Sequence, residues 1–148
     1  MMSDSSPAST PRPGALRVLY VDDEPSLRFV IRAWLQSHGH AVETASDGAE
    51  GLFKIARQVR ESGRPFDLVI TDLDMPAMGG LAFIRVLREA ALPVRIIVYS
   101  GELTQPRRAE LAALGVDAAL EKSSHPQDLV EAVACIGRSP PTGPDGES

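Results

Sequence analysis

The sequence of 148 residues has one cysteine, few lysines and no long apolar run. The single Cys135 cannot form a disulfide within the chain, which favours a reducing compartment, and we expect a cytoplasmic protein. We also expect Cys135 to be a small buried hydrophobe on the last helix. No stretch approaches the roughly 20 apolar residues that span a bilayer, and residues 1–14 lack the apolar core of a secretory signal. We therefore expect neither a membrane protein nor a secreted one.

Positive charge is scarce as well. The formal net charge is −5, the isoelectric point is about 5.2, and the only lysines are Lys54 and Lys122. This balance argues against a nucleic-acid-binding surface, so we expect no direct contact with nucleic acid. Both ends are rich in Ser, Pro and Gly, which cannot bury enough apolar area to offset the entropy of ordering. We expect disordered tails at residues 1–15 and 138–148, around one domain at 16–137.

Five short apolar runs alternate with segments of helical periodicity. The runs at 16–21, 40–45, 66–71, 95–99 and 118–121 are rich in Val, Ile, Leu and Ala. Such runs, each followed by a helix, are typical of parallel strands buried on both faces. With right-handed crossovers the pattern predicts an α/β fold: a doubly wound five-stranded parallel sheet, (βα)5 and flavodoxin-like, with strand order 2-1-3-4-5.

The first helix illustrates the periodicity. It is expected from Pro25 to His38, with proline near its start and Gly39 after its end. Its apolar residues recur at helical spacing, which predicts a core-facing stripe made of Leu27, Val30, Ile31, Trp34 and Leu35.

Polar side chains stand where several of the predicted strands end. Asp22 and Asp23 follow the first strand, Asp72 follows the third, Ser100 closes the fourth, and Lys122 closes the fifth. Ligands of open α/β sheets bind at the carboxyl ends of the strands. We therefore expect three carboxylates, one hydroxyl and one ammonium to meet at one edge.

This set suits phosphoryl transfer onto a carboxylate with the help of Mg²⁺. Asp23 and Asp72 would end adjacent strands and supply the oxygen ligands that Mg²⁺ prefers, Asp22 would hold a metal-bound water, and the Asp74 backbone carbonyl would add a ligand. Asp72 would be the nucleophile that forms an acyl phosphate. Lys122 and the Ser100 hydroxyl would contact the phosphoryl oxygens and stabilise their charge. A capping role for the acidic run at 22–24 would explain one of these acids but not Asp72.

In this order, the motifs resemble those of the receiver domains of bacterial two-component response regulators, over about 16–137. The resemblance rests on Val21-Asp22-Asp23-Glu24, on Asp67 to Pro76 with Gly80, on Ser100-Gly101 and on Lys122. It implies a phosphoacceptor Asp72, Mg²⁺ at Asp23, Asp72 and the Asp74 carbonyl, and phosphoryl contacts from Ser100 and Lys122. It also implies a donor, either a sensor histidine kinase or a histidine phosphotransfer protein, and an output protein that the sequence does not identify. Such a domain is a signalling module with only self-phosphorylation and autodephosphorylation chemistry.

Four positions depart from the usual receiver pattern. Ser123 follows Lys122 where receivers usually have proline, so we expect a trans Lys122–Ser123 bond. Ala119 occupies the usual position of a switch aromatic, and Gly79 stands where the turn often has Asp. Tyr99 is an aromatic in an unusual place, and we expect Tyr99 or the loop after Ser100 to carry the conformational change outward.

Two other functions compete with a phosphoacceptor. Asp72-Leu73-Asp74 matches part of the motif of haloacid-dehalogenase-type phosphatases, although Pro76 does not match its continuation and the motif does not require the earlier Asp pair. A receiver-like interaction module that works without phosphorylation is the other alternative. The intact set of acids, hydroxyl and lysine argues against it.

Overall fold

The computed structural model describes residues 14–138, in which five strands alternate with five helices. The predicted tails at 1–15 and 138–148 lie almost entirely outside the described residues. No helix in the described part is long and apolar enough to cross a membrane. In chain order the elements are β1 (Arg17–Val21), α1 (Pro25–Ser37), β2 (Ala41–Ala45), α2 (Gly48–Ser62), β3 (Leu68–Thr71), α3 (Gly80–Glu89), β4 (Arg95–Ser100), α4 (Gln105–Ala113), β5 (Ala118–Glu121) and α5 (Pro126–Arg138).

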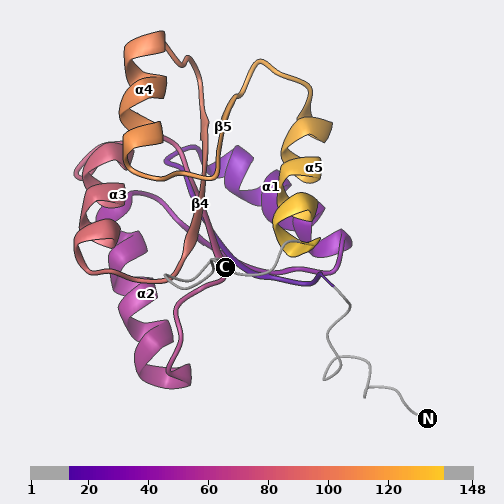
Figure 1. Ribbon diagram of the computed structural model, residues 1–148. Coiled ribbons are helices and arrows are strands. Elements are labelled where there is room, and N and C mark those ends of the chain that lie inside the picture. Colours follow the sequence, from indigo (N-terminus) through magenta and orange to yellow (C-terminus); the bar gives the residue numbers. More distant parts are fainter. Residues whose placement is uncertain (1–13, 139–148) are drawn as a thin grey trace.

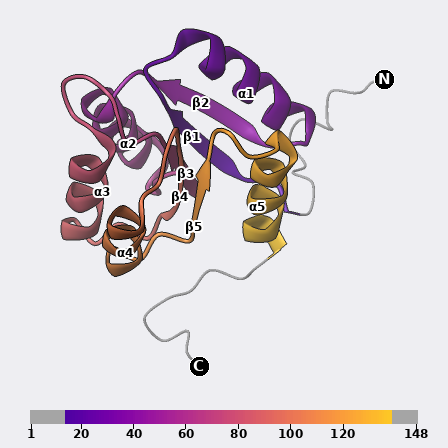
Figure 2. The same ribbon diagram turned by 90° about the horizontal axis from the view of Figure 1, so that it is seen from above.

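The strands form one parallel sheet in the order β2-β1-β3-β4-β5, which confirms the predicted fold and topology. Helices cover both faces of the sheet: α1 and α5 lie on one side, and α2, α3 and α4 on the other (Figure 1). The view from above shows the same two layers (Figure 2). Because all strands are parallel, their carboxyl ends lie along a single edge.

Each face of the sheet has its own apolar core, as expected for strands buried on both sides. Residues of β1 alternate between the two cores: Val18 and Tyr20 pack toward α1 and α5, and Leu19 and Val21 toward α2 and α3. The core on the α1 and α5 side is built from fully or nearly fully buried residues, namely Val18, Tyr20, Ile31, Leu35, Leu68, Ile70, Ile97, Tyr99, Leu129 and Val133.

Side chains just before two helices satisfy backbone groups at the helix starts. Asp47 is the N-cap of α2, and its side chain accepts a hydrogen bond from the Glu50 N–H at 2.8 Å. The Glu50 carboxylate reaches back to the N–H and the hydroxyl of Ser46, at 2.7 and 2.8 Å. Before α5, Nδ1 of His125 accepts from the Gln127 N–H at 3.1 Å. These bonds explain why both helices begin where the polar residues end.

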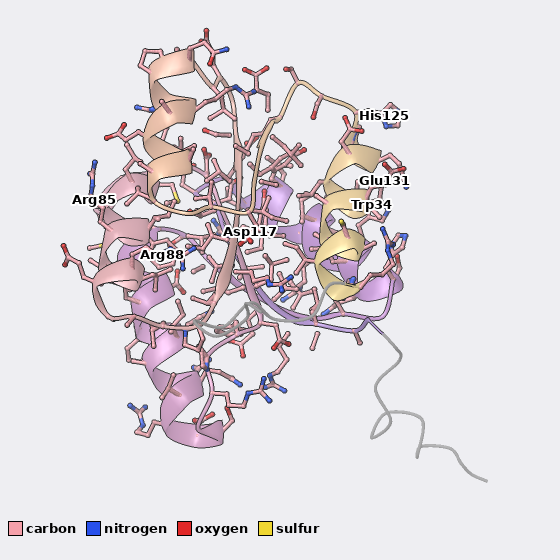
Figure 3. All side chains as sticks on the ribbon, viewed as in Figure 1. Trp34, Arg85, Arg88, Asp117, His125 and Glu131 are labelled. Carbon is pink, nitrogen blue, oxygen red and sulfur yellow. The ribbon has the colours of Figure 1, made fainter. Side chains whose placement is uncertain are left out.

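Arginines on α3 hold that helix to its neighbours. The guanidinium of Arg88 donates to the carbonyls of Leu114, Val94 and Gly115, at 2.8, 3.1 and 3.0 Å. Arg85, one turn earlier, donates to Glu110 of α4 at 2.7 Å. Figure 3 shows both side chains on α3. The last turn of α3 is therefore fixed to the end of α4 and to the segment that enters β4.

Two expectations about burial were wrong. Val30 is 53% exposed, whereas Ile31 and Leu35 are buried, because the part of α1 that contacts the sheet is narrower than the apolar stripe. Cys135 is exposed rather than buried. It lies two residues beyond the buried Val133, about 200° further round α5, and so it faces away from the sheet.

Candidate functional site

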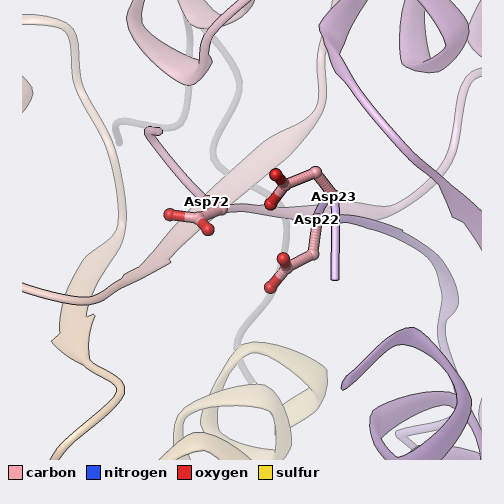
Figure 4. A group of neighbouring side chains, drawn as sticks. All are labelled: Asp22, Asp23 and Asp72. Atoms are coloured by element: carbon pink, nitrogen blue, oxygen red, sulfur yellow. The ribbon is translucent and has the colours of Figure 1, made fainter. Parts of the chain in front are cut away.

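Three carboxylates meet at the carboxyl end of the sheet. Asp22 and Asp23 follow β1, Asp72 follows β3, and one oxygen from each lies within 4.8 Å of the others. The register of the two strands, in which Val21 pairs with Thr71, brings these residues together. Figure 4 shows Asp22 and Asp23 beside each other with Asp72 across from them. Asp22 and Asp72 are buried, while Asp23 is exposed, so the group opens to solvent on the Asp23 side.

The carboxylate of Asp72 is held by donors from three parts of the chain. Its Oδ1 accepts from the N–H groups of Leu73 and Asp74, at 2.6 and 3.3 Å, and from the Ser100 hydroxyl at 2.8 Å. Its Oδ2 accepts from Lys122 Nζ at 2.8 Å. Ser100 is fully buried, and Asp72 is 6% exposed. The structure thus brings together Asp72, Ser100 and Lys122, three residues that the sequence predicted to work together.

Lys122 lies between two acids. Its Nζ is 2.8 Å from Oδ2 of Asp22 and 2.8 Å from Oδ2 of Asp72. Burial alone would lower the pKa of this ammonium, but the hydrogen bonds and negative charges of the two aspartates outweigh burial and raise its pKa. Lys122 is therefore a fixed positive charge beside the Asp72 carboxylate.

Asp22 is fully buried, and two of its contacts were not foreseen. Its Oδ1 accepts from the Glu24 N–H at 3.0 Å, and its Oδ2 accepts from the Tyr20 hydroxyl at 2.9 Å. Arg28 of α1 donates from Nη1 to the backbone carbonyl of Asp22 at 2.7 Å. Strand alternation places Tyr20 on the same face as Asp22, a signal that the sequence reasoning missed.

The donor set fits a hard divalent cation. Carboxylate oxygens at this separation are the ligands that Mg²⁺ uses, and the exposed Asp23 leaves room for water. Asp74 is exposed, and its Oδ1 lies 3.6 Å from Nη1 of Arg107 on α4. The role of the Asp74 carbonyl as a ligand stays a prediction.

The positions that depart from the receiver pattern have specific surroundings. Residues 14–138 contain no cis peptide bond, so the Lys122–Ser123 bond is trans as predicted. Ala119 is partly buried in the core beside α4, and Arg108 Nη1 lies 3.4 Å from its carbonyl oxygen. Gly79 is the N-cap of α3, where a Cβ would lie 3.0 Å from the Leu73 carbonyl oxygen. A side chain at position 79 would therefore be crowded by the turn after Asp72.

Comparison with known proteins gives one consistent result. The model of the response regulator receiver domain family matches residues 18–134. The transcriptional regulatory protein SphR for alkaline phosphatase synthesis, from Synechococcus elongatus, is 35% identical over 127 residues, which cover 84% of this chain and 48% of SphR. The chain spans about half the length of the curated relatives it matches first.

Solved structures of similar fold include two relatives above 30% identity. The chemotaxis protein CheY4 of Vibrio cholerae is 31% identical, with a TM-score of 0.71 over 82% of this chain and 98% of that one. The response regulator TrrA of Thermotoga maritima, whose structure is a complex with Mg²⁺ and BeF, is 31% identical. Its TM-score is 0.68, over 81% of this chain and 97% of that one.

Proposed function

The chain belongs to the response regulator receiver domain family, and on that premise we propose that it accepts a phosphoryl group on Asp72. A receiver is a phosphoacceptor signalling module of two-component systems rather than a classical enzyme. The observation that carries the proposal is the set of contacts around Asp72, a buried carboxylate bonded at 2.8 Å both to the Ser100 hydroxyl and to the Lys122 ammonium. We propose that residues 16–137 form this unit and that it works in the cytoplasm.

The residues around Asp72 suit the transfer step. A carboxylate oxygen of Asp72 attacks the phosphorus of a phosphohistidine, a P–O bond forms, the P–N bond breaks, and the leaving imidazole of the donor takes a proton from solvent. Lys122 Nζ lies against Asp72 Oδ2, where it stabilises charge on the phosphoryl oxygens. The Ser100 hydroxyl moves its hydrogen bond from Asp72 Oδ1 to a phosphoryl oxygen. Positioning and charge neutralisation, rather than a general base, lower the barrier.

We propose that Mg²⁺ is bound by Asp23 and Asp72, with Asp22 reaching it through water and the Asp74 carbonyl as a further ligand. When bound, the ion neutralises negative charge on the phosphoryl group. The close group of three carboxylates supports this assignment, as does the complex of TrrA with Mg²⁺ and BeF.

The phosphoryl donor that we propose is a sensor histidine kinase or a histidine phosphotransfer protein. Phosphorylation would switch a surface that binds an output protein. The segment from Ser100 to α4 is the expected place of change, because Ser100 contacts Asp72 directly and this segment continues from it.

The test is phosphorylation by acetyl phosphate and Mg²⁺, read by intact mass. The wild-type protein should gain one phosphoryl group, and the Asp72→Asn variant none. Asp74→Asn is the matched control, because this nearby side chain is exposed and makes no hydrogen bond to Asp72 through its carboxylate in the described structure. It should be labelled like the wild type. Undiminished labelling of Asp72→Asn would overturn the assignment.

The same experiment separates the alternative functions. Steady turnover of a generic phosphate ester, without a stable single label, would favour a phosphatase of the haloacid dehalogenase type. A wild-type protein that takes up no phosphoryl group, yet binds its partner, would favour a phosphorylation-independent module.

A further inference from the structure

Tyr20 is a buried phenol directly beneath the acidic group. It lies on β1 two residues before Asp22, is 1% exposed, and packs in the core under α1 and α5. Its hydroxyl donates to Oδ2 of Asp22 at 2.9 Å. An apolar residue could fill this core position without burying a polar group. The buried Tyr20 hydroxyl and its hydrogen bond to Asp22 therefore require an explanation.

The contacts of Asp22 show what this hydroxyl does. Each carboxylate oxygen accepts about two hydrogen bonds. Oδ2 receives two, from Tyr20 and from Lys122 Nζ at 2.8 Å, while Oδ1 receives one, from the Glu24 N–H at 3.0 Å. Oδ2 is therefore saturated by donors, and Oδ1 keeps capacity for one more partner. The Tyr20 hydroxyl reaches Oδ2 from within the apolar core, where Tyr20 is 1% exposed, so bulk solvent does not replace a missing donor on that side.

Lys122 alone cannot hold Asp22 in this orientation throughout the reaction. Its ammonium is shared between Asp22 and Asp72, at 2.8 Å from each. A phosphoryl group on Asp72 adds negative charge on the Asp72 side and draws the ammonium toward it. The Tyr20 hydroxyl has no such competing partner among its described hydrogen bonds, and it stays on Oδ2.

We propose that Tyr20 is a positioning residue for the magnesium site, a role that rests on the proposed function. Its hydroxyl fixes the orientation of the Asp22 carboxylate, so that Oδ1 is the oxygen presented to the cation or to its bound water. Partners that orient direct metal ligands usually contribute strongly to metal affinity, and because Tyr20 acts through Asp22 and a bound water, we expect its effect at the lower end of that range. A core tyrosine whose hydroxyl had no role at the site would not affect the affinity for Mg²⁺.

The test compares Tyr20→Phe with the wild type, because this change removes only the hydroxyl oxygen. Mg²⁺ is titrated into the unphosphorylated protein and followed by calorimetry. We expect the Mg²⁺ affinity of Tyr20→Phe to fall by about 10-fold, the lower end of the range for such partners. The Mg²⁺ concentration that gives half-maximal labelling by acetyl phosphate should rise by the same factor.

Tyr99→Phe is the matched control. Tyr99 is also a buried tyrosine of the same core, 5% exposed, and its hydroxyl makes no hydrogen bond to Asp22 in the described structure. Its removal should leave the Mg²⁺ affinity within about twofold of the wild type, well below the effect of an orienting partner. An equal fall in both variants would show a general effect of core polarity and overturn the proposal.

Two further outcomes decide the matter. Equal Mg²⁺ affinity of Tyr20→Phe and wild type overturns the role of Tyr20, even if Asp72 is phosphorylated normally, so this failure is distinct from failure of the proposed function. A wild-type protein without measurable Mg²⁺ binding overturns both. If Tyr20→Phe does not fold, NMR of the wild-type protein provides the test instead. The signal of the Tyr20 hydroxyl proton should shift on addition of Mg²⁺, and the signal of the Tyr99 hydroxyl proton should not. An unshifted Tyr20 signal overturns the proposal.

Discussion

Glu121 and Leu103 connect the last strand to the loop that leaves the site. The Glu121 carboxylate accepts a hydrogen bond from the Leu103 N–H at 2.9 Å, and Leu103 is 6% exposed. Next to this bond, the Lys122 N–H donates to the Ser100 carbonyl at 2.7 Å. The loop between β4 and α4 is therefore tied to β5 on the side where receivers usually carry a switch aromatic and this chain has Ala119.

We predict that Glu121→Ala loosens this loop. The Leu103 N–H would lose its partner in a buried position, which costs about 1–3 kcal/mol in the free energy of unfolding. Hydrogen exchange should accelerate at residues 101–104, while Glu121→Gln, which keeps an acceptor oxygen, should behave more like the wild type. Unchanged exchange in Glu121→Ala would contradict the link.

The contacts of Ser100 predict which residues change their environment on phosphorylation. Because Ser100 contacts both Asp72 and, through its carbonyl, the N–H of Lys122, amide NMR shifts on phosphorylation should include residues 99–104. In Glu121→Ala we expect the shifts of 101–104 to persist and those of β5 to diminish. Shifts that spare residues 99–104 in the wild type would show that the change travels by another route.

Gly80→Ala should disrupt the turn that carries Asp72. A Cβ at position 80 would collide with the Asp72 carbonyl oxygen and lie 2.8 Å from the Leu73 Cα, and backbone atoms cannot move aside as the end of a flexible side chain can. We expect a loss of roughly 1–3 kcal/mol or more in the free energy of unfolding, measured by urea, together with slower labelling of Asp72. Gly63→Ala is not a suitable control, because Gly63 has a φ of 81° that alanine adopts poorly. Gly101, which has open space around it, is the appropriate comparison.

Asp23→Ala should weaken Mg²⁺ binding more than any change outside the acidic group. It removes the exposed carboxylate of the three, and we expect the affinity measured by calorimetry to fall by more than about tenfold. Glu24→Ala is the control, since the exposed Glu24 makes no side-chain capping bond to α1. Retention of full affinity in Asp23→Ala would place the cation elsewhere.

We predict that the Glu50 carboxylate makes a pH-dependent contribution to the free energy of unfolding. The hydrogen bonds from the N–H and hydroxyl of Ser46 lower its pKa below the usual 4.5. A carboxyl whose pKa is lower in the folded state stabilises the fold at pH values above its unfolded pKa, and this contribution disappears as the pH falls through the folded pKa. Glu50→Gln should therefore lower the free energy of unfolding at pH 7, and lower it much less near pH 3, as measured by urea unfolding.

The sequence by itself determined the order of elements, the sheet topology and the five residues of the site, Asp72 included. Hydrophobic periodicity is a local property, and right-handed crossovers leave few topologies, so the sequence locates the strands and the first helix within a few residues. Because all strands of a parallel sheet end at one edge, Asp22, Asp23, Asp72, Ser100 and Lys122 were expected to meet, and they do.

Only the tertiary structure decided which atoms are bonded to which. The Tyr20 hydroxyl, the sharing of Lys122 between two aspartates and the bond from Leu103 to Glu121 depend on side-chain orientations across neighbouring strands, which no local pattern encodes. Burial on the helices was decided in the same way: Val30 and Cys135 are apolar enough for a core, but Val30 lies outside the part of α1 that contacts the sheet, and Cys135 faces away from the sheet on α5. The contacts that depend on packing between distant segments are therefore the ones that sequence reasoning missed.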